Sequence, residues 1–241
     1  VALVIADSAG GFDYRDMATE VRRDAPALRL VFVAGVPGPD QIDLRAMIAA
    51  SPDDAEIERW LAEVRPDPGE VATMLLSGGT TSLSKLIPRT HDDYVLNARL
   101  CGRAGGFGED TVFMAILPLG HNYNLASPGM LGCFYYGGTV VLAPSGDAAE
   151  VFPLVQRERV SVIAAAVPLI SNWLNSPVPE EYDLLSLRVI QNGGARLAPE
   201  LRARLRQRFG CAPQEIYGTA EGLINMVPLD AAEDMLLCSS G

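Results

Sequence analysis

Apolar runs alternate with helical patterns along most of this chain. Stretches rich in valine, isoleucine and leucine lie at 1–7, 28–35, 72–79, 111–119, 139–145, 161–167, 187–194 and 214–222. Segments in which apolar residues recur at helical spacing follow most of them, at 14–23, 91–102, 128–136, 148–160, 168–174 and 198–209. Nearly continuous apolar strands are typical of a parallel sheet that is covered on both faces. The pattern predicts an α/β fold with mainly parallel sheets flanked by helices.

The region 36–68 interrupts this alternation. It contains five prolines and many acidic residues, and it has one helical pattern at 54–64. This composition favours a connector with one short helix. The chain has neither an internal repeat nor a low-complexity segment.

Composition and charge narrow the classes of partner. The 241 residues are 49% apolar and 20% charged, which is ordinary for a globular protein. A net charge of -11 argues against nucleic acid as a partner, because phosphate backbones need clustered cations. Since no apolar run reaches the roughly 18 residues of a membrane span and no cationic segment precedes the first apolar run, we expect neither a membrane segment nor a signal peptide. Four dispersed cysteines without a C-x-x-C motif favour a cytoplasmic protein without zinc or disulfides.

The densest run of positive charge lies in the predicted helix at 198–209. Arginines alternate with other residues at 202, 204, 206 and 208. Spacing by two residues distributes them around a helix instead of along one stripe. We therefore interpret all four as solvated surface residues.

Lys85 is the only lysine of the chain, and it lies in a loop of small and hydroxyl residues, SGGTTSLSKLIP at 77–88. The loop follows a predicted buried strand and precedes a helix for which Thr90 is the expected N-cap and Asp93 stands in the capping-box position. Glycines allow close backbone approach, hydroxyls donate hydrogen bonds, and lysine adds a mobile charge, which together suit a polyphosphate. A flexible surface loop has the same composition, and the loop is not a Walker A motif because Leu86 follows Lys85. The residues of this candidate phosphate loop are Ser77, Gly78, Gly79, Thr80, Thr81, Ser82, Ser84 and Lys85.

Three later segments carry candidate chemistry at the ends of predicted strands, where ligands bind in such sheets. His121, Asn122 and Tyr123 follow the strand at 111–119, although a polar turn that satisfies its own backbone is an alternative. Ser127 precedes Pro128 and, taken alone, is best explained as a helix N-cap. The remaining candidates are the small residues Gly193, Gly194 and Ala195, for which an ordinary strand-to-helix turn is equally good, and the motif Tyr217, Gly218, Thr219, Ala220, Glu221.

These motifs resemble, in order and spacing, those of the adenylate-forming superfamily, which contains acyl-CoA ligases, aryl-CoA ligases and nonribosomal peptide synthetase adenylation domains. The extension LIPRTHDDY after the loop is similar to the stand-alone aryl-acid branch of siderophore biosynthesis. The resemblance covers most of the chain. It implies a ligase that uses ATP and Mg²⁺ to convert an aromatic acid to an acyl-adenylate with release of pyrophosphate. The acyl group is then transferred to the phosphopantetheine thiol of an aryl carrier protein.

The same resemblance implies roles for individual residues. Lys85, His121, Thr219 and Glu221 are the expected catalytic residues, with Glu221 as the metal ligand. The loop from Ser77 to Ser82, together with Lys85, Gly193, Gly194, Ala195, Tyr217, Gly218 and Thr219, is expected to bind ATP, Tyr217 by stacking on adenine. The expected aryl-binding residues are Asn122, Tyr123, Ser127, Gly194 and Ile224.

By the same resemblance, Ser127 favours 2,3-dihydroxybenzoate as the substrate, because serine at the matching position accompanies that acid and cysteine accompanies salicylate. Ile224 matches neither the valine nor the leucine of those two groups, which leaves salicylate or another 3-hydroxy aromatic acid open. Ser82 replaces the usual glycine of the loop, which also leaves a non-catalytic nucleotide-binding protein open. An acyl-CoA ligase of the same superfamily is a further alternative.

The chain is expected to be an incomplete large domain. It begins in a strand-like run and stops at CSSG without a closing element. By resemblance, the start of the large domain, the ribose-binding aspartate and a mobile C-terminal domain with its own lysine lie outside residues 1–241. We therefore expect residues 1–241 alone to bind nucleotide weakly and to adenylate poorly.

Overall fold

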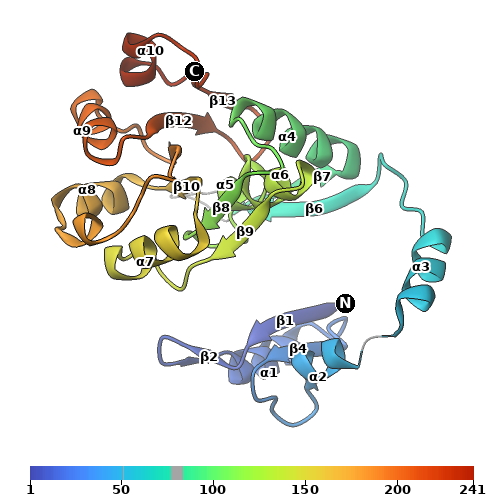
Figure 1. Cartoon of the computed structure of the whole chain (residues 1–241). Helices are drawn as coiled ribbons and strands as arrows, with labels where there is room; N and C mark the ends of the chain where they lie inside the picture. Colours follow the sequence, from blue (N-terminus) through green and yellow to red (C-terminus); the bar gives the residue numbers. More distant parts are fainter. Residues whose placement is uncertain (51, 77–83) are drawn as a thin grey trace. The chain divides into compact units, whose positions relative to one another are not determined.

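The computed structural model describes residues 1–50, 52–76 and 84–241. These form two compact units, Val1–Pro66 and Asp67–Gly241, which we describe separately. Figure 1 shows the elements of both. None of the helices in the described ranges is both long enough and apolar enough to cross a membrane.

The first unit is a small three-stranded parallel sheet with helices. Its strands are β1 (Ala2–Ala6), β4 (Leu30–Ala34) and β5 (Ile42–Asp43), in the order β1-β4-β5. A short hairpin of β2 (Ser8–Ala9) and β3 (Phe12–Asp13) leads into α1 (Tyr14–Asp24), whose Ala18 packs with Val31 and Val33 of β4. The helices α2 (Leu44–Ala49) and α3 (Asp54–Glu63) complete it. The short helix predicted in the connector is therefore present, whereas β5 and α2 are too short to give a recognisable pattern.

The second unit is built on a six-stranded sheet in the order β13-β12-β11-β10-β8-β9. All neighbouring strands are parallel except β13 and β12, which run antiparallel to each other. The predicted α/β fold with a mainly parallel sheet is confirmed. The strands are β8 (Val112–Ala115), β9 (Thr139–Leu142), β10 (Val162–Ala165), β11 (Val189–Gly193), β12 (Ala212–Gly218) and β13 (Ile224–Met226).

Two hydrophobic cores lie on the opposite faces of this sheet. Along β8, Met114 packs with one core, whereas Phe113 and Ala115 pack with the other, as alternating strand side chains must. The first core is closed by α7 (Ala148–Glu158), α8 (Val167–Asn175) and α9 (Pro199–Phe209). The opposite face is covered by α5 (Asn122–Ala126) and α6 (Gly129–Tyr135), beside α4 (His91–Ala104). Figure 1 shows α7, α8 and α9 together on one side of the sheet.

The order of the strands places a topological switch point beside β8. From β8 the chain moves to the edge strand β9, and it then crosses back to β10 on the other side of β8 and continues outward to β11 and β12. Loops at the carboxyl ends of β8 and β10 therefore diverge, which leaves a crevice at that edge of the sheet.

A separate antiparallel pair, β6 (Val71–Leu76) and β7 (Leu86–Thr90), precedes α4. Thr90 caps α4 as predicted, because its hydroxyl accepts from the backbone N–H of Asp93 at 3.3 Å. The carboxylate of Asp93 does not complete a capping box but pairs with Arg89. The strand β7 was not predicted, because a proline within LIPRT argues against a strand from sequence alone.

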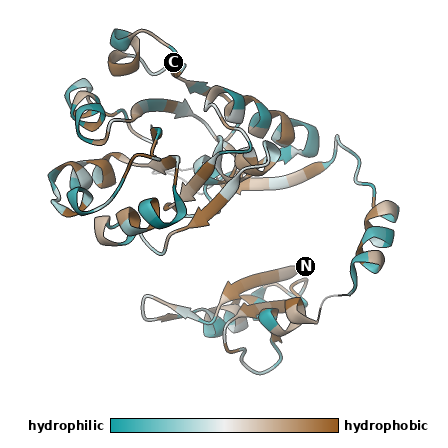
Figure 2. Cartoon of the chain, viewed as in Figure 1, coloured by the Kyte–Doolittle hydropathy of each residue, from teal (hydrophilic) through white to brown (hydrophobic). Residues whose placement is uncertain are grey.

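The helix with four arginines departs from the sequence interpretation. Arg202 is completely buried, and its guanidinium lies 3.2 Å from the carboxylate of Glu215 on β12. Figure 2 shows hydrophilic colouring on part of β12, a strand in which Gln214 and Glu215 are both buried. The interpretation of Arg202 as a surface residue was therefore wrong, because a polar interior strand needs a partner that the helix pattern does not reveal.

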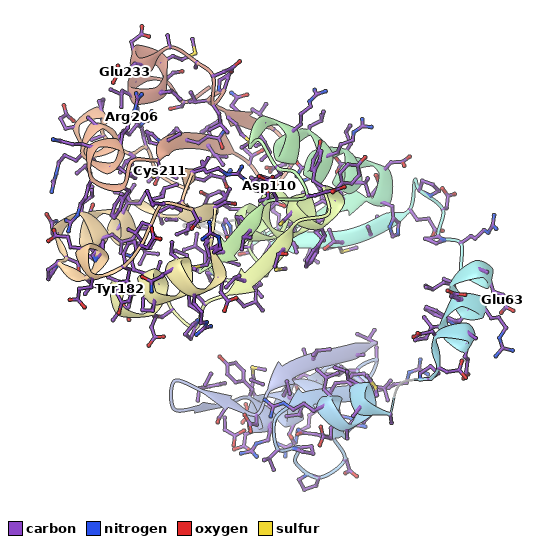
Figure 3. All side chains as sticks on the ribbon, in the orientation of Figure 1. Glu63, Asp110, Tyr182, Arg206, Cys211 and Glu233 are labelled. Atoms are coloured by element: carbon purple, nitrogen blue, oxygen red, sulfur yellow. The ribbon has the colours of Figure 1, made fainter. Side chains whose placement is uncertain are left out.

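Arg206, one turn further along α9, is partly exposed and pairs with Glu233 of α10 (Glu233–Cys238) at 3.1 Å. Figure 3 labels both residues of this exposed pair.

Candidate active site

A cavity of about 910 Å³ opens in the second unit at the carboxyl ends of β8, β11 and β12. Part of β6 contributes as well. Segments that lie far apart in the sequence meet here because parallel strands end at the same edge of a sheet. The described residues that line it are Thr73, Met74, Leu75, Leu76, Gly120, His121, Asn122, Tyr123, Leu125, Ser127, Gly193, Gly194, Ile216, Gly218, Thr219, Ala220, Glu221 and Ile224.

His121 begins the short helix α5 and lines the cavity at the same time. Its Nδ1 accepts the backbone N–H of Tyr123 at 3.2 Å, which is the cap of α5. With Nδ1 engaged as an acceptor, the proton of the neutral imidazole is on Nε2. His121 thus satisfies its own turn and still has a donor for a ligand, so the two interpretations of this residue do not exclude each other.

Tyr123 is buried against Gly193. A Cβ on Gly193 would lie 3.0 Å from the Tyr123 ring, so the ring would have to shift if this residue carried a side chain. Burial holds the pKa of the Tyr123 phenol well above its usual value, and its O–H points at the carbonyl of Ala165 at 3.5 Å. Gly194 differs, because its φ of +84° favours glycine while no atom lies close to its missing side chain. Ala195 is not among the described lining residues, and its carbonyl accepts from Asn192 at 2.7 Å.

Ser127 is buried at the cavity wall and is not the N-cap of α6. Pro128 occupies the N-cap position of α6, and no side-chain cap is formed there. The Ser127 hydroxyl instead accepts from the amides of Asn122 at 3.2 Å and Asn97 at 3.3 Å. The sequence alone favoured an N-cap, and that interpretation was wrong because α6 begins at Gly129, one residue later than the Ser-Pro pair suggests.

The turn between β12 and β13 brings Thr219 and Glu221 to the cavity. The N–H of Thr219 donates to the carbonyl of Leu223 at 2.9 Å, which closes the turn. Ile224 pairs with Gly218 in the strand register and fills the space beside it. Tyr217 is about half exposed and is not one of the described lining residues.

Arg89 fixes this turn from the opposite side. Although it is charged, it is only 2% exposed, and it forms an ion pair with Asp93. Its Nη1 donates to the carbonyl of Ala220 at 2.9 Å, and its guanidinium lies 5.3 Å from the ring centre of Tyr94. The hydrogen bond to Asp93 raises the pKa of Arg89, so the cation persists at every working pH.

The candidate phosphate loop is described only at its end. Ser77 to Ser82 lie outside the described residues. Lys85 is exposed immediately before β7 and is not among the described residues that line the cavity. Its expected role stays a prediction.

Sequence reasoning missed the second layer of this site. Arg89, Tyr94 and Asn97 are all buried and contact site residues, and none of them was singled out. Tyr94 donates to Asn122 at 2.8 Å, which is a contact across 28 residues of chain. A signal was present, since asparagine is a weak helix former in the middle of the predicted helix at 91–102.

Comparison with known proteins agrees with this arrangement. The family model described as AMP-binding enzyme matches residues 3–239. The chain is 40% identical over 240 residues to the 2,3-dihydroxybenzoate-AMP ligase of Bacillus subtilis and 41% identical over 223 residues to a salicyl-AMP ligase / salicyl-S-ArCP synthetase of Mycobacterium tuberculosis. These alignments cover 100% and 92% of this chain but only 43% and 38% of the relatives. The apo structure of MbtA from Mycobacterium smegmatis superposes with a TM-score of 0.85 at 33% identity, over 100% of this chain and 42% of that one.

Proposed function

Because the chain belongs to the family of AMP-binding enzymes, we propose that it forms part of an aryl-acid adenylating site. The protein that carries it activates an aromatic carboxylic acid, most favourably 2,3-dihydroxybenzoate, with ATP. The chain spans about two fifths of the curated relatives it matches, and we propose that it is a portion of the large domain. The observation that carries the proposal is that His121, Asn122, Ser127, Thr219 and Glu221 all line one cavity.

The cavity has two chemically different sides. Tyr123, Gly193 and Ile224 supply apolar contact on which a planar ring can lie, with Asn122 and Ser127 as polar groups at the same side. On the other side the turn of β12 and β13 presents the Thr219 hydroxyl and the Glu221 carboxylate. An aryl acid on the first side would direct its carboxylate toward a phosphate that is bound by the second.

Catalysis would consist mainly of positioning. The acid is ionised at neutral pH and needs no general base, so its oxygen attacks the α-phosphorus of ATP while the bond to pyrophosphate breaks. Holding two anions in line lowers the entropic part of the barrier. The Nε2–H of His121 and the hydroxyl of Thr219 donate to phosphate oxygens, and Lys85 adds positive charge near the leaving group.

Glu221 fits the magnesium role only in combination with a nucleotide. Among the described residues, no group of three or more His, Cys, Asp or Glu side chains could hold a metal ion unaided. Mg²⁺ commonly uses one or two carboxylates together with substrate phosphates and water, which is compatible with a single carboxylate at the cavity wall. When bound there, Mg²⁺ supplies charge neutralisation for the phosphates.

Transfer of the acyl group completes the proposed reaction. An acyl-adenylate is an activated mixed anhydride, so a thiolate attacks its carbonyl carbon and AMP leaves. The resemblance to the siderophore branch favours the phosphopantetheine thiol of an aryl carrier protein as the acceptor. One of the similar proteins carries the name salicyl-S-ArCP synthetase, which supports this acceptor.

ATP–pyrophosphate exchange by the complete protein tests the proposal. The acids offered separately are 2,3-dihydroxybenzoate, salicylate, 3-hydroxyanthranilate, 3-hydroxypicolinate and an aliphatic acid. We expect the strongest exchange with 2,3-dihydroxybenzoate and a loss of at least about tenfold in Glu221→Gln. Preference for another aryl acid would keep the reaction and change the substrate. Absence of exchange with every acid would replace the proposal by a non-catalytic nucleotide-binding protein.

A further inference from the structure

The hydroxyl of Ser127 receives two hydrogen bonds from side-chain amides. Asn97 Nδ2 lies 3.3 Å from Ser127 Oγ, and Asn122 Nδ2 lies 3.2 Å from the same oxygen. A serine hydroxyl accepts through two lone pairs and donates through one proton. Both lone pairs are occupied in this arrangement, and the proton must point away from both amides.

The orientation of the Asn97 amide follows from a second contact. Its Nδ2 also donates to the backbone carbonyl of Ala126 at 2.6 Å. A carbonyl oxygen can only accept a hydrogen bond, so the nitrogen and not the oxygen of this amide faces Ala126 and Ser127. Asn97 is 7% exposed, which leaves little room for water to take its place as a donor.

The Asn122 amide is oriented from its other end. The phenol of Tyr94 donates to Asn122 Oδ1 at 2.8 Å, and Asn122 Nδ2, at the other end of the amide plane, donates to Ser127 Oγ. Tyr94 is itself buried, and burial raises the pKa of its phenol, so the O–H is retained as a donor at neutral pH. The helix α4 therefore fixes both amides around Ser127, through Tyr94 for one and Asn97 for the other.

We propose that Asn97 is a positioning residue for ligand selectivity, because it turns the Ser127 O–H into the cavity as a hydrogen-bond donor. Ser127 is 2% exposed and lines the cavity, and no protein acceptor for its proton is found among the described residues. The pocket then favours an aryl acid with an acceptor atom next to Ser127. This inference rests on the proposed function and adds a residue outside the cavity wall that sets its selectivity.

The test compares two acids that differ only in the group at position 3. A phenolic hydroxyl, as in 2,3-dihydroxybenzoate, can accept from Ser127, whereas the amine of 3-amino-2-hydroxybenzoate is mainly a donor. The quantity measured is the ratio of kcat/KM for the hydroxy acid to that for the amino acid, by ATP–pyrophosphate exchange in the complete protein. A ratio of kcat/KM values cancels losses that affect both acids equally.

Two substitutions change the direction of the Ser127 proton. In Asn97→Asp the new carboxylate accepts that proton, so the lone pair of Ser127 that Asn97 occupied faces the cavity and the ratio falls by about tenfold. In Asn97→Leu the hydroxyl is no longer directed, and a smaller fall is expected. Either variant in a Ser127→Ala background leaves the ratio of that background unchanged, because Asn97 acts only through the hydroxyl.

Asn124→Leu is the matched control. Asn124 is fully buried and its Nδ2 donates to the carbonyl of Leu117 at 2.7 Å, whereas the donors to Ser127 are Asn97 and Asn122. This variant is expected to lose stability without moving the ratio. Thermal unfolding of all variants identifies any that fail to fold, and Asn97→Leu remains informative if Asn97→Asp does not fold.

The outcomes separate the two proposals. The inference is supported if the ratio falls in the Asn97 variants, stays unchanged in Asn124→Leu, and does not fall further when an Asn97 substitution is added to Ser127→Ala. An unmodified protein that exchanges normally while the Asn97 variants keep its ratio overturns the inference alone. A fall of equal size in the Ser127→Ala background also overturns it, and an unmodified protein that exchanges with no aryl acid overturns both proposals.

Discussion

Replacing Arg202 with methionine removes the cation from the interior of the second unit. In the folded protein its Nε donates to the carbonyl of Leu197 at 2.9 Å and its Nη1 to the carbonyl of Ser239 at 2.5 Å. Its Nη2 lies 3.2 Å from the Glu215 carboxylate without the alignment of a hydrogen bond. Burial lowers the pKa of Arg202 and raises that of Glu215, because desolvation disfavours the charged form of each group.

The expected loss in the free energy of unfolding follows from the Glu215 carboxylate, which stays buried without its partner. A buried ion pair that loses one partner costs about 3–5 kcal/mol, because the remaining charge has neither water nor a counterion. Methionine is unbranched and similar in length, so the loss from packing is small by comparison. For a domain of this size the change corresponds to a fall in Tm of roughly 10 °C.

Tryptophan fluorescence can report the second unit by itself. The chain has two tryptophans, of which Trp60 lies in the first unit and is exposed, while Trp173 lies in the core of the second. In a Trp60→Phe background, urea unfolding followed through Trp173 gives the free energy of unfolding of the second unit. Arg202→Met is measured in that background.

Arg206→Met is the matched control on the same helix. Its partner Glu233 and Arg206 itself are both largely solvated, so its loss should cost less than about 1 kcal/mol. The double variant Arg202→Met with Glu215→Gln should be more stable than Arg202→Met alone, since the unpaired charge is then removed. Equal effects of Arg202→Met and Arg206→Met, or no recovery in the double variant, would refute the reasoning.

The remaining predictions concern the same unit. The pKa of Glu215 is raised from its usual value near 4.5, so its ionisation opposes folding. The free energy of unfolding is therefore greatest below that value and falls as the pH rises through the folded-state pKa. In Glu215→Gln the urea midpoint should change less with pH across that window. Arg89→Met removes the charged donor from the Ala220 carbonyl and should cost about 2–3 kcal/mol in urea unfolding, whereas a cost near zero would mean that water replaces it. Gly193→Ala places a methyl group 3.0 Å from the Tyr123 ring and should cost about 1–3 kcal/mol by the same assay, with unchanged stability showing that the ring can move freely.

Local pattern was sufficient for most of the second unit. The strands β8 to β12 and the helices α4, α7, α8 and α9 all lie where the alternation of apolar and polar residues predicted them. Pro199 opens α9 and Thr90 caps α4 because these preferences depend on neighbouring residues only. The elements β7, β13 and α5 were not predicted, because a proline within β7 argues against a strand and because β13 and α5 contain no continuous apolar run.

For the candidate site, too, the sequence predicted some residues and missed others. His121, Asn122, Tyr123, Ser127 and the turn of Thr219 and Glu221 were found from motifs, because each motif is a continuous stretch of sequence. The residues that hold them were not found. Arg89 contacts Ala220, which is 131 residues away in the sequence, and Asn97 contacts Ser127, which is 30 residues away. A local sequence pattern does not predict contacts between residues so far apart.

By itself the sequence determined the α/β architecture, the positions of the long helices and strands, and the resemblance to adenylate-forming enzymes. These depend on period, composition and short motifs, which a chain carries before it folds. Only the tertiary structure decided that Arg202 is interior while Arg206 is solvated, that Tyr123 occupies the space above Gly193, and that Ser127 is held by two amides and not by a helix end. The reason is that burial and hydrogen-bond partners depend on which segments the sheet brings together. Residues of the same type at a regular spacing, such as the arginines of α9, therefore differ in burial because they contact different neighbours in the folded protein.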